Sequence, residues 1–246
     1  MRDATTAQGQ TAAFPPTQWS VVLAARAKDA PRSSAALETL CRTYWHPLYA
    51  YVRRFGHAPH DAQDLTQEFF ARLLAGGYME RADREKGRFR TFLLTALKRF
   101  MVNEWERARA QKRGGGQQPL PLDGELAERL YAAGPAAEES PEKVYAHHCA
   151  VTLLNAALQE LQKEFTVAGK TEEFESLKPH LTAAHGEIPY EELAARLNRD
   201  VGAARVTVHR FRKRYRQLFR EQVARTVAHP EDVEDEMRYL VAAMSG

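Results

Sequence analysis

The sequence predicts an all-α protein in which two helical domains are joined by a flexible acidic linker. Apolar residues recur at helical spacing in both halves, and no run of Val, Ile, Thr or Tyr alternates with polar residues long enough to form a strand. Between the halves, glycine and proline are frequent over residues 114–142. Residues 119–142 also carry six acidic side chains and one basic side chain, Arg129. These features place the first domain at 17–112, the linker at 113–143 and the second domain at 144–228.

The overall composition is that of a globular protein. The chain has 246 residues, of which 44% are hydrophobic and 27% are charged, which fits one or two domains. Its two cysteines, Cys41 and Cys149, are too few for a disulfide framework. The sequence contains no continuous apolar window of about 18 residues, and its first 16 residues are polar rather than signal-like. We therefore expect a cytoplasmic protein that does not contact a membrane and has a disordered tail over 1–16.

Four helices are expected in the first domain. Thr17 is placed to cap the first helix, and Ser33 or Ser34 to cap the second. Gly56 is expected to end the second helix, and Pro47 to kink it. The four helices are predicted over 18–27, 35–56, 61–77 and 89–113.

The linker and the second domain are also expected to be helical where they are regular. One short helix is predicted inside the linker, over 125–133. The second domain begins with a helix near 144–165 and ends with two helices over 189–198 and 201–227. Residues 229–246 form an acidic extension that contains a short helix, with Pro230 at its start.

The last two helices of the second domain have the pattern of a helix-turn-helix. In the second of them one face is apolar, with Ala204, Val208, Phe211, Tyr215 and Leu218. The other face is basic, and residues 205–220 hold seven Lys or Arg and no acid. Such a helix can present cations to phosphates and guanine edges in the major groove. The alternative is a solvated basic face on a purely structural helix.

An acidic stripe is predicted on the third helix of the first domain. Asp61, Asp64 and Glu68 share one side of this helix, while the neighbouring stripe is apolar. The stripe can be a solvated surface or a docking surface for a basic partner. A metal site or an acid–base pair is not indicated, because no histidine shares the stripe and no oxygen-rich loop follows it.

The fourth helix combines cations with aromatic rings. Residues 84–113 hold ten Lys or Arg against three Glu, with Phe89, Phe92, Phe100 and Trp105 among them. Cations and stacking rings suit single-stranded nucleic acid. The alternative is that the aromatic residues form the core.

Catalytic motifs are not found. The consecutive residues His147, His148 and Cys149 point in different directions on a helix, so they cannot share one metal ion. The sequence has no phosphate-binding glycine loop, nucleophile elbow or HExxH motif. We expect no enzyme activity, no cofactor and no metal; a metal-dependent hydrolase would require a bound ion that this sequence does not predict.

Two stretches of the sequence resemble extracytoplasmic-function (ECF) RNA polymerase sigma factors. Residues 40–56, 61–74 and 87–113 are similar to the second conserved region of that family, with Asp61, Asp64, Leu65, Gln67, Glu68 and Phe70 matching its motif. Residues 190–216 are similar to the fourth region, which is a helix-turn-helix. The order of these two regions across an acidic linker is also that of the family.

The resemblance implies a function and a set of partners. The chain would bind core RNA polymerase through its β′ clamp helices, and direct initiation by recognising the minus-ten and minus-thirty-five promoter elements. The acidic linker would pass through the polymerase near the template strand and the RNA exit. The alternative function is a stand-alone helix-turn-helix regulator that binds duplex DNA without the polymerase.

The resemblance also assigns roles to individual residues. The loop 80–90 would hold a base extruded from the melted minus-ten element. Polymerase contacts would come from Asp61, Asp64, Gln67 and Glu68. DNA contacts would come from Lys98, Arg99, Asn103 and Arg107 in the first domain and from Arg205, Val206, His209, Arg210, Arg212 and Lys213 in the second.

Regulation is expected from an anti-sigma protein, from a Ser/Thr kinase or from the C-terminal extension. The segment 226–240 resembles the extension of a subgroup found in bacteria rich in Ser/Thr kinases. Phosphorylation of Thr66 would add negative charge beside Asp64 and Glu68. In the extension, an apolar stripe is expected to dock on the second domain; it consists of Val233, Met237, Leu240, Val241 and Met244.

Overall fold

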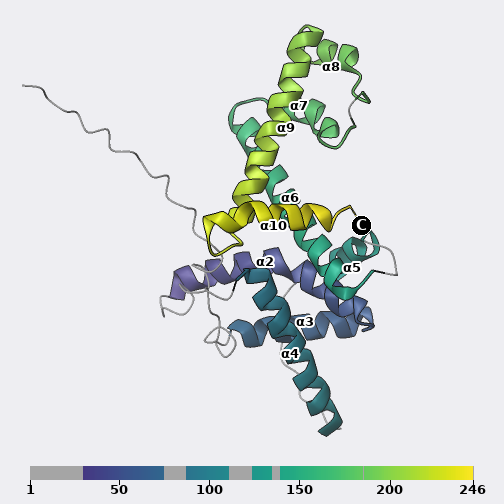
Figure 1. Cartoon of the computed structure of the whole chain (residues 1–246), viewed down its shortest axis with the longest axis vertical. Coiled ribbons are helices and arrows are strands. Elements are labelled where there is room, and N and C mark those ends of the chain that lie inside the picture. The colour runs from purple at the N-terminus through teal and green to yellow at the C-terminus, as the bar shows by residue number, and fades with distance from the viewer. Residues whose placement is uncertain (1–29, 75–86, 111–123, 135–138, 185, 246) are drawn as a thin grey trace, which may run out of the picture.

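The computed structural model describes residues 30–74, 87–110, 124–134, 139–184 and 186–245 (Figure 1). Every regular element in these ranges is a helix, so the predicted all-α class is confirmed. The predicted first helix, the N-terminal tail and most of the loop 80–90 lie outside the described residues. None of the described helices is long and apolar enough to cross a membrane.

Helices α2 (Ala30–Arg54), α3 (Pro59–Leu74) and α4 (Phe89–Ala110) form the first half of the molecule. Aromatic rings fill their core: Trp45 packs on Phe70, and Phe69 packs on Phe100. α2 begins before Ser33 and Ser34, so neither of these predicted residues caps it. The helix continues through Pro47. It ends near Gly56, whose φ of 103° lies in the left-handed region that favours glycine.

The predicted linker contains helix α5 (Gly124–Ala132), which is docked on the first half. The carboxylate of Glu128 accepts hydrogen bonds from the Arg53 guanidinium at 2.8 and 2.9 Å and from the Tyr49 hydroxyl. Hydrogen bonds from Arg53 hold the pKa of Glu128 below its usual value, although burial opposes this effect. Burial and the bond to Glu128 raise the pKa of Tyr49. One acid of the linker is therefore paired within the chain.

Helix α6 (Pro141–Val167) connects the two halves. Ser140 caps its N-terminus, and Pro141 occupies the first turn, where a missing N–H costs nothing. Its first half packs against α2 and buries Tyr145, Cys149 and Leu153. Its second half packs against α9 (Val201–Ala224). The predicted boundary at residue 144 gives α6 to the second domain, whereas in the structure α6 contributes to the cores of both halves.

The second half is formed around α9 by short elements. They are α7 (Thr171–Leu177), η3 (Lys178–Leu181), α8 (Tyr190–Arg196), η4 (Pro230–Asp232) and α10 (Val233–Ala242). Phe211 of α9 packs on Phe165 and Phe174, which joins α9 to α6 and α7. The Tyr215 hydroxyl donates to the Leu154 carbonyl at 3.1 Å, and Arg214 pairs with Glu164.

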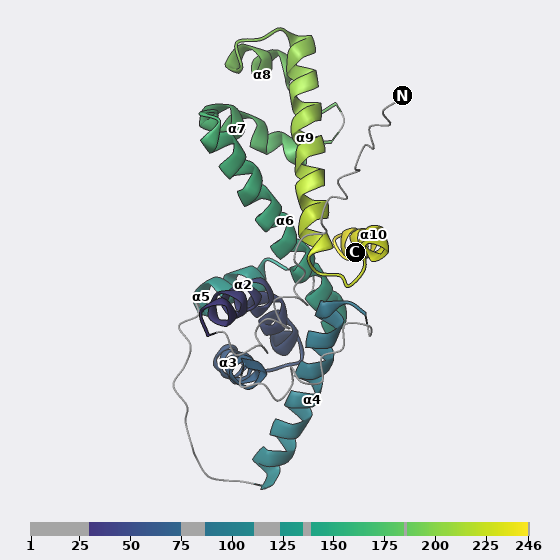
Figure 2. The same ribbon diagram turned by 90° about the vertical axis from the view of Figure 1, so that its left-hand side faces the viewer.

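The molecule is elongated. Figure 1 and Figure 2 show α7, α8 and the start of α9 at one end, and α2 to α5 at the other. α6 and α9 run side by side near the middle and diverge toward α7 and α8 (Figure 2). α10 crosses the middle next to the end of α9 (Figure 1). The start of α9 is thus far from the first half, which leaves it accessible.

The α2–α6 interface contains a buried histidine that predicts a pH dependence of stability. His148 is 5% exposed, and its Nε2 has no hydrogen-bond partner within the described part of the chain. A side chain at Gly134 would place its Cβ 2.8 Å from that nitrogen, so the His148 ring would have to shift to accept a larger residue there. Burial, with the charges of His147 and His46, lowers the pKa of His148 from 6.5 to about 4.

The free energy of unfolding is expected to fall as the pH drops from about 6.5 to about 4. In this range the unfolded chain binds a proton at residue 148 and the folded chain does not, which removes up to about 3 kcal/mol. Urea unfolding measured across this range should show a smaller pH dependence for His148→Leu. The control His229→Gln changes an exposed histidine and should keep the wild-type profile. Identical profiles for both variants and wild type would contradict the assignment.

Candidate nucleic-acid interface

Helices α8 and α9 are joined by a tight turn, which is the arrangement that a helix-turn-helix requires. The turn between them passes through Asn198, whose φ of 50° is left-handed, a conformation that asparagine tolerates better than most residues. Asp200 then caps α9, because its carboxylate accepts a hydrogen bond from the Ala203 N–H at 2.8 Å. The apolar face of α9 is buried at Ala204, Val208 and Phe211. These contacts fix the angle at which α9 leaves the turn.

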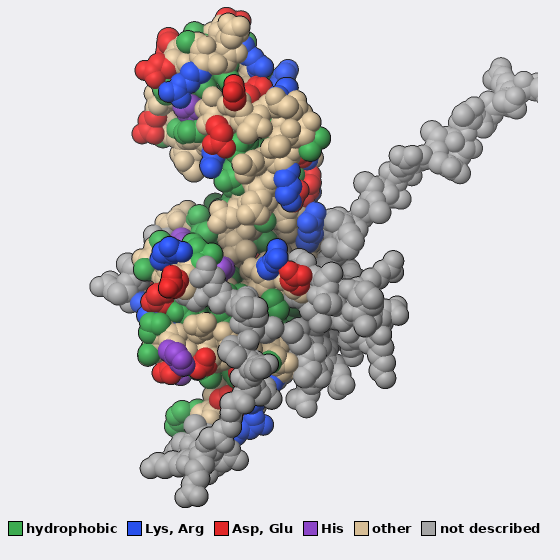
Figure 3. Space-filling model, turned by 180° about the vertical axis from the view of Figure 1, so that it is seen from behind, with side chains coloured by type: hydrophobic (Ala, Val, Ile, Leu, Met, Phe, Trp, Pro, Cys, Tyr) green, Lys and Arg blue, Asp and Glu red, His purple; other side chains and the backbone are tan. Residues whose placement is uncertain are grey.

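The opposite face of α9 is exposed at five of the six predicted DNA-contacting residues. They are Arg205, Val206, His209, Arg210 and Lys213. The Arg205 guanidinium lies 5.1 Å from the ring centre of Tyr190, which holds it against α8 by a cation–π contact. The face of the molecule in Figure 3 shows acidic and basic side chains interspersed over this end. The basic surface is therefore a stripe along α9 and does not cover the whole end of the molecule.

Arg212 differs from the other predicted residues. It is half-buried, and its guanidinium donates to the His180 carbonyl at 2.6 and 2.8 Å and to the Ala183 carbonyl. These bonds tie η3 and the following turn to α9. Arg212 was assigned to DNA by the family resemblance, and its carbonyl partners, 32 and 29 residues away in the sequence, are not visible in any local pattern.

The Asp200 cap is expected to stabilise the helix-turn-helix measurably. Asp200→Ala should lower the free energy of unfolding by about 1 kcal/mol, since it leaves the first turn of α9 without its side-chain acceptor. Asp200→Asn should retain most of the stability, because asparagine caps helices equally well. Thermal unfolding of the three proteins checks this, and an equal loss for both variants would assign the effect to the charge of Asp200 instead.

The residues of the acidic stripe on α3 differ in their exposure to solvent. Asp61 and Asp64 are exposed, and Asp64 lies 3.2 Å from the exposed His60 imidazole. Glu68 is half-buried and accepts a hydrogen bond from Arg72 at 2.7 Å. Gln67, also predicted to bind the polymerase, is 8% exposed. The surface available to a partner is therefore centred on the first two acids.

The predicted phosphorylation of Thr66 does not agree with the structure. Thr66 is fully buried, and its hydroxyl donates to the Ala62 carbonyl at 2.7 Å. A kinase needs access to that hydroxyl, so the folded chain does not offer it. The hypothesis was wrong because Thr66 is two residues from both Asp64 and Glu68, a rotation of about 200° that turns its side chain away from the exposed stripe and into the core.

The predicted DNA-contacting residues of α4 lie in different environments. Arg99 and Asn103 are exposed, while Arg107 pairs with Glu104 at 2.9 Å. Lys98 pairs with Glu142, at the start of α6, at 2.6 Å. That hydrogen bond raises the pKa of Lys98 and lowers the pKa of Glu142.

The aromatic residues of α4 also separate into two groups. Phe89 and Phe100 are fully buried, which is the core alternative considered above. Trp105 is 60% exposed, together with Val102 at 56%, on the part of α4 that projects from the bundle (Figure 1). Only this outer part presents an aromatic ring beside the cations.

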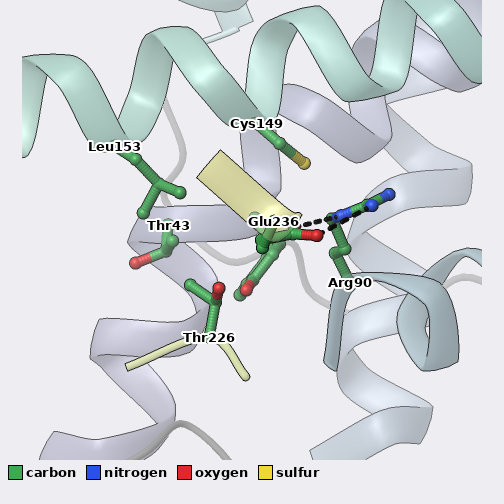
Figure 4. A pocket seen from close by; sticks show the side chains of 7 residues that line it. Thr43, Arg90, Cys149, Leu153, Thr226 and Glu236 are labelled. Atoms are coloured by element: carbon green, nitrogen blue, oxygen red, sulfur yellow. Dashed lines mark hydrogen bonds and ion pairs between the residues drawn. The ribbon is translucent and has the colours of Figure 1, made fainter. Parts of the chain in front are cut away.

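The structure adds one functional candidate that the sequence analysis did not single out. Glu236 of α10 is buried and pairs with Arg88 and Arg90, at the end of the loop 80–90. Figure 4 shows its bonds to Arg90. One signal in the sequence could have identified Glu236. It lies three residues after Val233 and four before Leu240, so it shares the apolar face of α10 with them. The cavity next to this pair is about 10 Å³, at most the size of one water molecule, and has no room for a cofactor.

Within the described ranges, no group of three or more His, Cys, Asp or Glu side chains is arranged to hold a metal ion. His147 and His148 are in contact, with their ring planes at 82°, and His148 is buried. Burial raises the pKa of the Cys149 thiol to about 12, which keeps this thiol protonated and unreactive.

Comparisons with known proteins agree with this geometry. Residues 40–111 match the family model of sigma-70 region 2. Over 204 residues the chain is 28% identical to the ECF RNA polymerase sigma factor SigE of Mycolicibacterium smegmatis. The aligned region covers 80% of this chain and 68% of SigE. No solved structure matches the chain.

A sigma-70 region 2 bundle followed by a helix-turn-helix defines a transcription initiation factor of the sigma-70 type. The similarity to SigE over most of the chain specifies the group further. The chain thus carries sigma-70 region 2 and is similar to the ECF RNA polymerase sigma factors over most of its length.

Proposed function

We propose that this sigma factor directs promoter-specific initiation by dividing recognition between its two ends. The first half, 17–112, would dock on the β′ clamp helices of core RNA polymerase and bind the melted minus-ten element. The second half, 144–228, would bind the minus-thirty-five duplex through α9. The observation that carries the proposal is the exposed basic stripe of α9, which is braced by α8 and lies at the end of the molecule away from the first half.

Polymerase docking would use Asp61 and Asp64, the two exposed acids of α3. The DNA surface of the first half would consist of Arg99 and Asn103, with Trp105 available for stacking. On α9, Arg205, His209 and Arg210 would contact phosphates and base edges, and Val206 is 49% exposed beside them, which allows an apolar contact. Such binding would weaken as the salt concentration rises.

The acidic linker would have two states. In the free chain Glu128 pairs with Arg53, and Glu142 pairs with Lys98. In the holoenzyme the linker would follow the polymerase channel near the template strand and the RNA exit, where its negative charge would resemble that of nucleic acid. The Lys98 ammonium, released from Glu142, would then be available to promoter DNA.

The activity of the chain would be regulated by an anti-sigma protein or by a Ser/Thr kinase. A kinase would need an acceptor other than Thr66, because Thr66 is buried. The site of action would be the cytoplasm, where core polymerase and promoters are found.

Transcription reconstituted with core RNA polymerase and a promoter library tests the proposal. We expect specific transcripts only when the chain and the core enzyme are both present, and co-elution of the two in gel filtration. A stand-alone regulator would instead bind promoter duplex by itself and would not associate with the core enzyme. That result would contradict the proposed function.

A further inference from the structure

Helix α10 buries a charged residue between the two halves of the molecule. Its inner face consists of Val233, Glu236 and Leu240, each at most 1% exposed. A carboxylate in such a place costs several kcal/mol unless it is paired and hydrogen-bonded. The exposed acids of the same helix, Glu234 and Asp235, carry no such cost. The position of Glu236 therefore depends on its partners.

Those partners are the two arginines that flank the start of α4. Arg88 Nε lies 2.8 Å from Glu236 Oε2. Arg90 donates through Nε to Oε1 at 2.5 Å and through Nη2 to Oε2 at 3.1 Å (Figure 4). The ring of Tyr239 lies 4.1 Å from the Arg90 guanidinium and 5.9 Å from that of Arg88. Burial alone would lower the pKa of Arg90, but the hydrogen bonds and charge of Glu236 raise it. One α10 side chain thus occupies both cations.

Further contacts tie this junction to the second half. The Phe89 N–H, between the two arginines, donates to the Thr226 carbonyl just beyond α9 at 3.3 Å. On the outside, Arg220 of α9 pairs with Glu234 of α10 at 2.7 Å. The Tyr145 hydroxyl of α6 donates to the Arg90 carbonyl at 3.0 Å. α10 therefore connects the start of α4 to the end of α9.

We infer that α10 is an intramolecular clasp that occupies Arg88 and Arg90 in the free chain and must leave them when the chain engages promoter DNA in the holoenzyme. This inference rests on the proposed function, in which the loop 80–90 meets the melted minus-ten strand. The two guanidiniums cannot bind Glu236 and a nucleic-acid phosphate with the same donors at the same time. The Lys98–Glu142 pair has the same character, since an acid from outside the bundle covers a cation of α4.

The clasp also limits movement of the two halves relative to each other. While α10 is seated, the end of α9 is held to the start of α4 through Thr226 and Glu236. Release of α10 would free the two arginines, while α6 would still join the two halves.

Hydrogen exchange of the full-length chain tests the clasp. Amides of α10 would be followed in the free chain, in the complex with core RNA polymerase and in the promoter complex. We expect exchange at 233–242 to be at least about tenfold faster in the promoter complex, because the buried charge-assisted bonds are lost. Unchanged protection of α10 in a promoter complex that forms would overturn the clasp and make α10 a permanent part of the fold.

Two matched variants test whether Glu236 restrains DNA binding or only stabilises the fold. Glu236→Gln removes the charge from the buried pair, and Asp235→Asn removes a charge from the exposed face of the same helix, where Asp235 pairs only with Arg238 of α10 itself. For Glu236→Gln we expect about tenfold faster α10 exchange in the free chain and several-fold tighter promoter binding by the holoenzyme. For Asp235→Asn we expect neither change. Faster exchange without tighter promoter binding would overturn the clasp, because α10 would then stabilise the fold without restraining DNA binding.

The outcomes remain distinguishable from a failure of the proposed function. Co-elution of the wild-type chain with core polymerase is measured first, and its absence contradicts the proposed function itself. If Glu236→Gln loses its helical circular dichroism signal, the wild-type exchange comparison decides for or against the clasp.

Discussion

Reversing the charges of Asp61 and Asp64 together, as Asp61→Lys/Asp64→Lys, is expected to abolish binding to core RNA polymerase. Both side chains are exposed on α3 and make no bond to another helix in the described part of the chain. A basic partner that meets two cations there faces like-charge repulsion of several kcal/mol. The dissociation constant should rise at least about 100-fold.

Competition for core enzyme against wild-type chain measures this effect, and circular dichroism checks that the fold is retained. Glu38→Lys/Glu106→Lys is the matched control: it makes the same change of net charge at two other exposed positions of the first half. It should bind within a few-fold of wild type. If the α3 variant assembles normally, the docking surface lies elsewhere.

Arg210→Ala is expected to weaken promoter binding by about 1–3 kcal/mol if the guanidinium contacts a base, and to relax specificity at one position of the minus-thirty-five element. Arg210 is exposed on α9 and has no ion-pair partner in the described residues, so its removal leaves the fold intact. Arg205→Ala should show a similar loss. Its effect is less simple to interpret, because Arg205 also packs on Tyr190.

Holoenzyme binding to promoters with single substitutions in that element measures the effect. Arg225→Ala is the control, since Arg225 is exposed at the other end of α9. A uniform loss over all promoters would indicate a phosphate contact. Wild-type affinity for Arg210→Ala would contradict the proposed recognition surface.

These variants leave out Glu68, Gln67 and Arg212, because the structure shows that these three side chains are less accessible than the residues chosen. Glu68 belongs to the acidic stripe that helical periodicity predicted, whereas Gln67 and Arg212 were assigned by the family resemblance. Glu68 is paired with Arg72, Gln67 is buried, and Arg212 bonds to the carbonyls of His180 and Ala183. Charge and spacing identified the stripes, while tertiary contacts decided which members of each stripe remain accessible.

The sequence by itself determined the helical class, the helix-turn-helix and its two faces. Periodicity, turn residues and caps act within a few residues, so they are visible locally, as at Asn198 and Asp200. Only the tertiary structure decided that α6 serves both halves and that Glu236 pairs with Arg90 across 146 residues of sequence. Such pairings depend on which apolar faces meet when the helices pack, and no local pattern encodes the partner of a buried charge.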